Sequence, residues 1–225
     1  EPYGFNPWNY GQQKDADKYS YEEYSATAYR RGRQFMRAMN DEMPELKLLM
    51  FYQFKMFYGI SHNPDPVKRT ASIKAYSYGL MLPFLNGMLA EAGPKVQFIQ
   101  GNEPSYYYTQ PANFYKAYWE MRQGSRINVP EELHDKFDAQ VRAGNALYVD
   151  HLFALRSRPS VANGLTPEER ARWFEQNVYY GLQTSDEYVW LYSEKMDWWK
   201  NEKLPPGLEE SIISAKAKLQ TGRPL

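Results

Sequence analysis

The sequence predicts an α/β fold of parallel βα units that form all, or the C-terminal part, of a (β/α)8 barrel. Two observations predict it. Apolar runs of strand length alternate with segments of helical periodicity. No hairpin signal joins two strands, and the connections are helical, as parallel pairing requires. A self-contained open α/β sheet is the alternative. We expect one domain over residues 1–225, a length ample for a packed core.

The first half of the chain is expected to alternate helices and strands. The elements are a loop over 1–17, a helix over 18–40, a strand over 46–54, a loop over 59–66, a helix over 67–92 kinked at Pro83, and a strand that runs into a turn over 95–104. Pro, Gly and Asn predict the loops, and apolar residues at helical spacing predict the helices. The continuous apolar run LKLLMFYQF predicts a strand covered on both faces.

The second half is expected to be mostly helical up to about Leu155, with 146–155 as the only ambiguous stretch. A clear helix start follows, because Thr166 can cap the helix and Pro167 suits its first position. A strand over 187–193 and a last helix over 207–219 complete the chain. The three or four expected strands are few for this length, which favours part of a larger barrel.

Composition excludes several classes of function. The 27 basic and 27 acidic residues balance, so neither nucleic acid nor an anionic membrane is an expected partner. The apolar runs are too short to span a bilayer. Cysteine is absent, and the three histidines are scattered, so we expect no metal site. No phosphate-binding loop or dinucleotide fingerprint is present, and no cofactor is expected.

The chain begins with Glu1 and shows no signal-like segment, so we expect it to be processed, truncated or part of something larger. A missing partner chain that completes the barrel is one form of this expectation. The missing start methionine favours an extracellular or periplasmic location.

Aromatic rings and polar side chains gather where the expected strands end. Ligands of parallel α/β proteins bind at these ends. Tyr occurs 20 times and Trp 6 times, and rings with a polar edge suit sugars. The residues at the expected exits are Glu1, Tyr3, Trp8, Tyr52, Gln53, Lys55, Asn102, Glu103, Tyr106, Tyr107, Trp190, Tyr192, Glu194, Trp198 and Trp199. We therefore expect an aromatic cleft that binds an oligo- or polysaccharide.

The stretch YVWLYSE over 188–194 shows the pattern most clearly. Side chains alternate along a strand, so Tyr188, Trp190, Tyr192 and Glu194 are expected on one face. Two carboxylates across such a cleft can divide glycoside hydrolysis, one protonating the leaving oxygen and the other attacking carbon or activating water.

The stretch GNEP over 101–104 resembles the Asn-Glu-Pro signature of the large clan of (β/α)8-barrel glycoside hydrolases with catalytic glutamates on two strand ends. The resemblance implies that Glu103 is the acid/base, that Asn102 contacts the sugar beside the reacting carbon, and that Glu194 is the nucleophile. The sequence departs from the clan, which has two further strands between its catalytic pair, because 105–186 is expected to be largely helical. Glu103 and Glu194 are then expected on neighbouring late strands, with Glu1 at the place of the clan's acid/base.

Simpler interpretations remain open at each position. GNEP can be a turn in which Asn102 and Pro104 shape the backbone, Glu194 can pair with Lys195, and the rings can pack under loops. We expect a carbohydrate-active enzyme that hydrolyses glycosidic bonds. The alternative is a non-catalytic carbohydrate-binding or scaffold subunit of a larger assembly.

Overall fold

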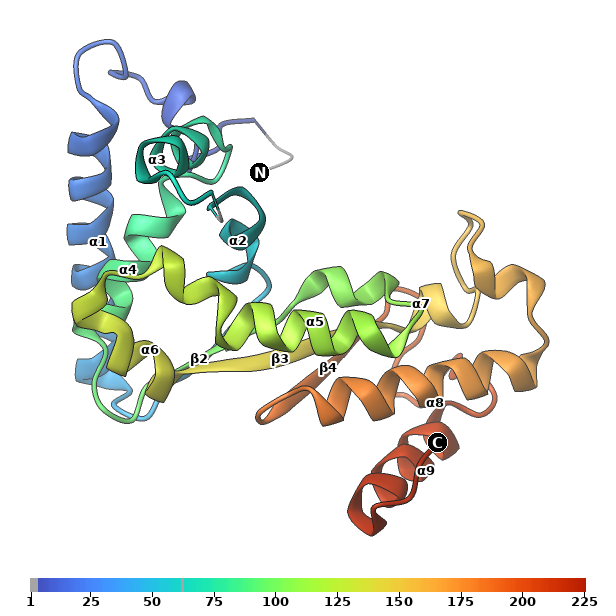
Figure 1. Cartoon of the computed structure of the whole chain (residues 1–225). Helices are drawn as coiled ribbons and strands as arrows, with labels where there is room; N and C mark the ends of the chain where they lie inside the picture. Colours follow the sequence, from blue (N-terminus) through green and yellow to red (C-terminus); the bar gives the residue numbers. More distant parts are fainter. Residues whose placement is uncertain (1–3, 62) are drawn as a thin grey trace. The chain divides into compact units, whose positions relative to one another are not determined.

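The computed structural model describes residues 4–61 and 63–225 and confirms an α/β fold (Figure 1). The chain forms two compact units, one of Glu1–Gln100 and Glu120–Arg142, the other of Gly101–Trp119 and Ala143–Leu225. The described residues contain four strands, and they pair in parallel, β1 with β2 and β3 with β4. Parallel pairing with helical connections is what the sequence predicts.

The helices and strands of the first unit, with the short 3-10 helices labelled η, are η1 Tyr10–Gln12, α1 Tyr21–Glu42, β1 Lys47–Met50, α2 Lys55–Ser61, α3 Pro66–Ala75, α4 Met81–Glu91, β2 Gln97–Gln100, η3 Gly124–Asn128, η4 Glu131–Leu133 and α6 His134–Gln140. Those of the second unit are η2 Glu103–Tyr107, α5 Pro111–Arg122, β3 Val141–Tyr148, α7 Val149–Leu152, η5 Val161–Gly164, α8 Pro167–Gln183, β4 Tyr188–Tyr192 and α9 Leu208–Thr221. The chain passes from one unit to the other three times, after Gln100, within α5 and within β3.

Helices α1 and α4 lie side by side in the first unit (Figure 1) and approach closely at two glycines. A Cβ atom on Gly32 would lie 2.0 Å from the carbonyl oxygen of Phe84. A Cβ atom on Gly87 would lie 2.0 Å from the carbonyl oxygen of Tyr29. Any larger residue would therefore overlap the neighbouring backbone.

The predicted helix over 18–40 is confirmed as α1. It begins with a capping box, in which the Ser20 hydroxyl accepts the backbone N–H of Glu23 at 3.2 Å and the Glu23 carboxylate accepts the N–H of Ser20 at 2.7 Å. These bonds satisfy backbone donors that have no partner inside the helix.

The Glu91 carboxylate of α4 binds Arg33 and Arg37 of α1, and the hydrogen bonds from these guanidinium groups lower the pKa of Glu91.

The strand predicted over 46–54 is shorter, because β1 ends at Met50 and α2 begins at Lys55. Its register runs from Lys47 opposite Gln97 to Met50 opposite Gln100. The prediction that this strand is covered on both faces is also wrong, because Lys47 is exposed and the next three residues are only half-buried.

The helix predicted over 67–92 is two helices, α3 and α4, with residues 76–80 between them. Pro83 does not kink a continuous helix. It lies in the first turn of α4, where the backbone N–H that proline lacks would have no partner inside the helix. The loop predicted over 59–66 is likewise shorter, since α2 continues to Ser61.

The second unit holds a strand that the sequence did not predict. Residues expected to be mostly helical form β3, which pairs with β4 from Gly144 opposite Tyr188 to Tyr148 opposite Tyr192. Its last six residues, from Ala143 to Tyr148, are all buried, and the short α7 follows directly. The predicted strand over 187–193 and the predicted helix after Thr166 are confirmed as β4 and α8.

The two faces of the β3–β4 pair differ in character. Leu147, Val149, Val189 and Leu191 face the second unit's apolar core, together with residues of α8 and α9. The residues of opposite parity face a cluster of aromatic rings instead. The candidate site lies on this second face.

Candidate functional site

Four aromatic rings form a compact cluster on one face of the β3–β4 pair. The ring of Tyr106, which follows β2 in η2, lies 5.2 Å from that of Tyr148, 5.5 Å from that of Trp190 and 5.7 Å from that of Tyr192. Tyr106 is buried at the centre, whereas Tyr192 keeps 37% of its surface exposed. The cluster therefore packs as a small core that presents one ring to solvent.

Strand register explains why these rings meet. Ala146 lies opposite Trp190, and Tyr148 lies opposite Tyr192, so a small residue leaves room beside the largest ring. The indole Nε1 of Trp190 donates a 2.9 Å hydrogen bond to the carbonyl oxygen of Gly101. That bond joins β4 to the start of the GNEP stretch.

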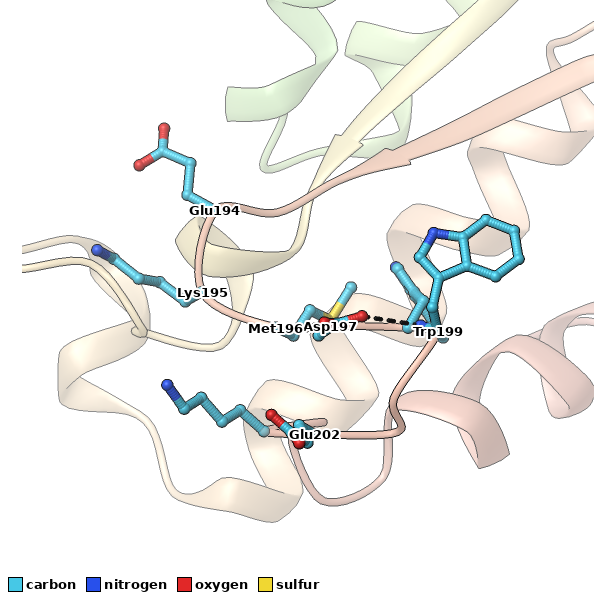
Figure 2. A pocket seen from close by; sticks show the side chains of 8 residues that line it. Glu194, Lys195, Met196, Asp197, Trp199 and Glu202 are labelled. Atoms are coloured by element: carbon cyan, nitrogen blue, oxygen red, sulfur yellow. Dashed lines mark hydrogen bonds between the residues drawn. The ribbon is translucent and has the colours of Figure 1, made fainter.

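Glu194 follows β4 and is held by two of these rings. Its Oε1 accepts hydrogen bonds from the hydroxyl of Tyr148, at 3.2 Å, and from the hydroxyl of Tyr192, at 3.1 Å. Among the described residues no ion pair joins Glu194 to Lys195, and Figure 2 shows the two side chains leaving the chain in different directions. The tyrosines, rather than Lys195, are therefore its partners.

A second carboxylate, Asp150, holds the backbone at this strand exit. Asp150 is completely buried in α7, and its two oxygens accept the hydroxyl of Ser193 and the backbone N–H of Glu194, the latter at 2.8 Å. The Ser193 oxygen in turn accepts the N–H groups of Lys195 and Met196, each at 3.1 Å. These bonds determine where the Glu194 side chain leaves the backbone.

Glu103 lies beside the same rings. It is the first residue of η2 and is half-buried. Burial raises the pKa of Tyr106, and the negative charge of Glu103 raises it further. The pKa of Tyr192 is raised by burial, by its hydrogen bond to Glu194, and in smaller part by the charge of Glu103. Glu103 and Glu194 thus act on one tyrosine from two segments of the chain.

The Asn102 side chain forms hydrogen bonds inside the second unit. Its backbone is left-handed, with φ 46°, and its side chain is buried. Its Nδ2 donates to Oδ1 of Asn145 at 2.8 Å, while Asn145 donates to the carbonyl oxygens of Gly181 and Thr184, each at 3.2 Å. Asn102 therefore ties the GNEP turn to β3 and to the end of α8.

Tyr148 has an altered acidity. Burial raises its pKa to about 12, and the nearby negative charges of Glu194 and Asp150 add to this effect. The guanidinium of Arg156 lies over its ring, 5.0 Å from the centre, and opposes the rise. Tyr148 consequently remains a hydrogen-bond donor to Glu194 across the physiological pH range.

Beyond Glu194 the chain forms an open hollow of about 420 Å³ (Figure 2). The residues that line it are Glu194, Lys195, Met196, Asp197, Trp198, Trp199, Glu202 and Lys203. The backbones of Asp197 and Glu202 exchange two hydrogen bonds of 3.0 Å, and the Asp197 carboxylate accepts the N–H of Trp199 at 3.0 Å. This short turn leaves Trp199 98% exposed.

The remaining predicted site residues lie elsewhere. In the first unit, Trp8 packs against Phe84 with ring centres 5.1 Å apart, and Tyr52 stacks on Tyr78 at 6.4 Å. Tyr107, in the second unit, packs edge-on against His151 at 5.0 Å.

The two polar residues predicted after β1 also have partners within the first unit. Gln53 is buried and donates to the carbonyl oxygen of Ile99 at 2.7 Å. Lys55 forms a half-buried ion pair with Glu120 at 3.4 Å. Glu1 and Tyr3 lie outside the described residues.

Sequence reasoning missed Tyr148 and Asp150, although a signal was present. The stretch ALYVD over 146–150 repeats the pattern of WLYSE over 190–194, with a tyrosine two residues before an acid in both. The register places the two tyrosines opposite each other. Comparing the strand ends with one another would therefore have identified both residues.

No group of three His, Asp or Glu side chains in the described part of the chain could hold a metal ion. None of the helices described there is both long and apolar enough to cross a membrane. Comparison of this chain with family models, with curated proteins and with solved structures gave no match.

Proposed function

We propose that the protein is a carbohydrate-active enzyme that hydrolyses glycosidic bonds with Glu103 and Glu194. The observation that carries the proposal is the pair of tyrosine hydroxyls on Glu194, at 3.2 and 3.1 Å, within a ring cluster that Glu103 also borders. Two carboxylates with different surroundings beside exposed aromatic surface are what acid-and-nucleophile hydrolysis requires.

The surroundings support different roles for the two glutamates. Two hydroxyl donors hold the Glu194 carboxylate in place, which suits a group that attacks carbon or activates water. Glu103 is half-buried beside rings and accepts no hydrogen bond from another described residue, so its carboxyl group is free to meet the leaving oxygen of a substrate. Tyr192, the exposed ring of the cluster, supplies the surface on which a sugar stacks.

The test is turnover by E103Q and E194Q on a panel of aryl glycosides and oligosaccharides. Each substitution keeps the side-chain shape and removes the carboxylate, so cleavage should fall by at least about a thousandfold while oligosaccharide binding persists. E168Q is the matched control, because Glu168 is an exposed glutamate in the first turn of α8. Cleavage that survives in both variants would overturn the assignment.

A non-catalytic carbohydrate-binding subunit is the second candidate. It is favoured by Asn102, whose amide is bound to Asn145 rather than facing a ligand. This candidate predicts that the panel is bound but not cleaved, and that E103Q, E194Q and the wild-type chain bind equally.

We also propose that the parallel βα units belong to a (β/α)8 barrel whose other strands come from another chain or segment. The support is the division of the β3–β4 pair into one face toward helices and one toward the ring cluster, as barrel strands have. Light scattering of the purified chain tests the partner, because a stable folded monomer contradicts an obligate one.

A further inference from the structure

We propose that Arg156 selects acidic saccharides, binding the carboxylate of a uronic acid unit beside Glu194. The inference rests on the proposed function for the location of the reacting sugar. It adds a substrate class and a specificity-determining residue.

The first observation is the state of the Arg156 guanidinium. Arg156 is half-buried after α7, and its charge lies over the Tyr148 ring at 5.0 Å. Within residues 4–61 and 63–225, no carboxylate forms an ion pair with it and no acceptor takes a hydrogen bond from it. A guanidinium carries five N–H donors in a planar fork, and the exposed part of this fork can bind a ligand.

The second observation is its distance from the candidate nucleophile. Arg156 covers the ring of Tyr148, and the hydroxyl of the same ring donates to Glu194 at 3.2 Å. One tyrosine side chain therefore bridges the cation and the carboxylate. A sugar whose reacting carbon is at Glu194 can have an acidic substituent at Arg156 without a second sugar unit between them.

Electrostatics favours an anion over a neutral group here. Glu194, Glu103 and Asp150 place negative charge around the ring cluster, which would repel an acidic sugar that had no cation to meet it. Arg156 offsets this repulsion for a ligand carboxylate. Lys195, an exposed residue that lines the hollow beside Glu194, adds a second positive charge.

Geometry selects a carboxylate within the class of anions. The planar guanidinium binds a planar carboxylate through two parallel hydrogen bonds, which a lysine cannot reproduce. The Arg156 guanidinium lies over the Tyr148 ring, 5.0 Å from its centre, and this cation–π contact limits its motion before binding. A sulfated sugar offers similar charge but a tetrahedral group, and it is tested separately.

Binding should be measured by calorimetry on the E194Q chain, which keeps the site and blocks turnover. The probes are trisaccharides of galacturonate, glucuronate and mannuronate, the methyl ester of each, and a sulfated neutral trisaccharide. We expect at least one uronate to bind about tenfold or more tighter than its own ester. Adding R156Q to the E194Q chain should abolish the tighter binding of the uronate over its ester. Adding R156K instead should retain only part of this preference.

R158Q is the matched control, because Arg158 is an exposed arginine two residues further along the same loop. It should preserve the preference for the acid over the ester. Thermal denaturation of each variant separates a lost contact from a lost fold, and R156K keeps the test valid if R156Q unfolds.

The inference is overturned if no uronate binds tighter than its ester, if R156Q and R158Q act alike, or if only the sulfated probe binds. Its failure is distinguishable from failure of the proposed function. Uronates that bind through Arg156 but are never cleaved by the wild-type chain contradict hydrolysis alone. Cleavage of neutral glycosides without uronate binding contradicts Arg156 alone.

Discussion

The buried carboxylate of Asp150 accepts the backbone N–H of Glu194 at 2.8 Å, and its other oxygen accepts the hydroxyl of Ser193. The short α7, which directly follows β3, thereby positions the residue that follows β4. The candidate nucleophile is consequently held through its backbone as well as through its carboxylate.

Replacing Asp150 with Asn should destabilise the fold by about 1–3 kcal/mol, because the amide places an NH2 donor, in place of one acceptor oxygen, against a backbone or hydroxyl donor in a fully buried place. Urea denaturation measures the loss. D17N is the control, since Asp17 is exposed in the first unit, and it should change the free energy of unfolding by less than about 0.5 kcal/mol. Equal stability of D150N and the wild-type chain would contradict the structural role of Asp150.

Removal of the tyrosine hydroxyls tests whether they prepare Glu194 for catalysis. Y148F and Y192F each delete one hydrogen bond to its Oε1 and keep the ring. A hydrogen bond to a charged group contributes about 1.5–3 kcal/mol, so kcat/KM should fall about tenfold or more in each variant. Steady-state kinetics on a cleaved substrate gives the value.

Y179F serves as the comparison for those two variants, because Tyr179 of α8 is half-buried against the apolar core and is not part of the ring cluster. It should retain wild-type kcat/KM. A loss in Y179F as large as that in Y148F would point to general loosening of the unit instead of a specific effect on Glu194.

The sequence predicted β4 but not its partner, and the reason lies in their residues. Tyr188–Tyr192 alternates rings with aliphatic residues, which is the period of a strand covered differently on its two faces. The middle of β3 is Ala143, Gly144, Asn145 and Ala146, residue types that are uncommon in strands. Burial on both faces, a tertiary effect, produces this strand.

For the candidate site too, the sequence predicted some features, whereas others depend on tertiary contacts. Glu103 and Glu194 could be identified from local stretches, because each ends a run of strand-forming residues. The contact of Tyr148 with Glu194 depends on the register of β3 against β4, which no single stretch contains. The interior role of Asn102 depends on Asn145, 43 positions away. The sequence pattern thus identified Glu103 and Glu194 as candidates, whereas the pairing of β3 with β4 determines the contact of Glu194 with Tyr148.

Alkaline pH should destabilise the fold in a manner that depends on Tyr148. The folded state holds this proton up to a pKa of about 12, whereas the unfolded chain releases it near 10. Stability from this group is complete below pH 10 and is lost as the pH rises from 10 to 12, because the folded state binds the proton more tightly there. Urea denaturation at pH 9–12 should therefore show a steeper loss for the wild-type chain than for Y148F. Parallel curves would contradict the raised pKa.

The packing of α1 on α4 should tolerate no side chain at its two glycines. G32A and G87A each place a methyl group 2.0 Å from a carbonyl oxygen of the facing helix, so the helices must separate. We expect a loss of about 2–3 kcal/mol or more in the free energy of unfolding, measured with urea. Alanine's better helix propensity, worth up to about 1 kcal/mol, offsets only part of it.

Gly59 of α2 is the matched control for that prediction. A Cβ atom there meets no other atom within 4 Å, and the residue is exposed. G59A should leave stability unchanged or raise it by up to about 1 kcal/mol, because alanine favours the helix and restricts the unfolded chain. If G32A and G87A behaved like G59A, α1 and α4 would not lie in backbone contact. If instead G32A and G87A lower the free energy of unfolding and G59A does not, the close approach of α1 and α4 lies at Gly32 and Gly87.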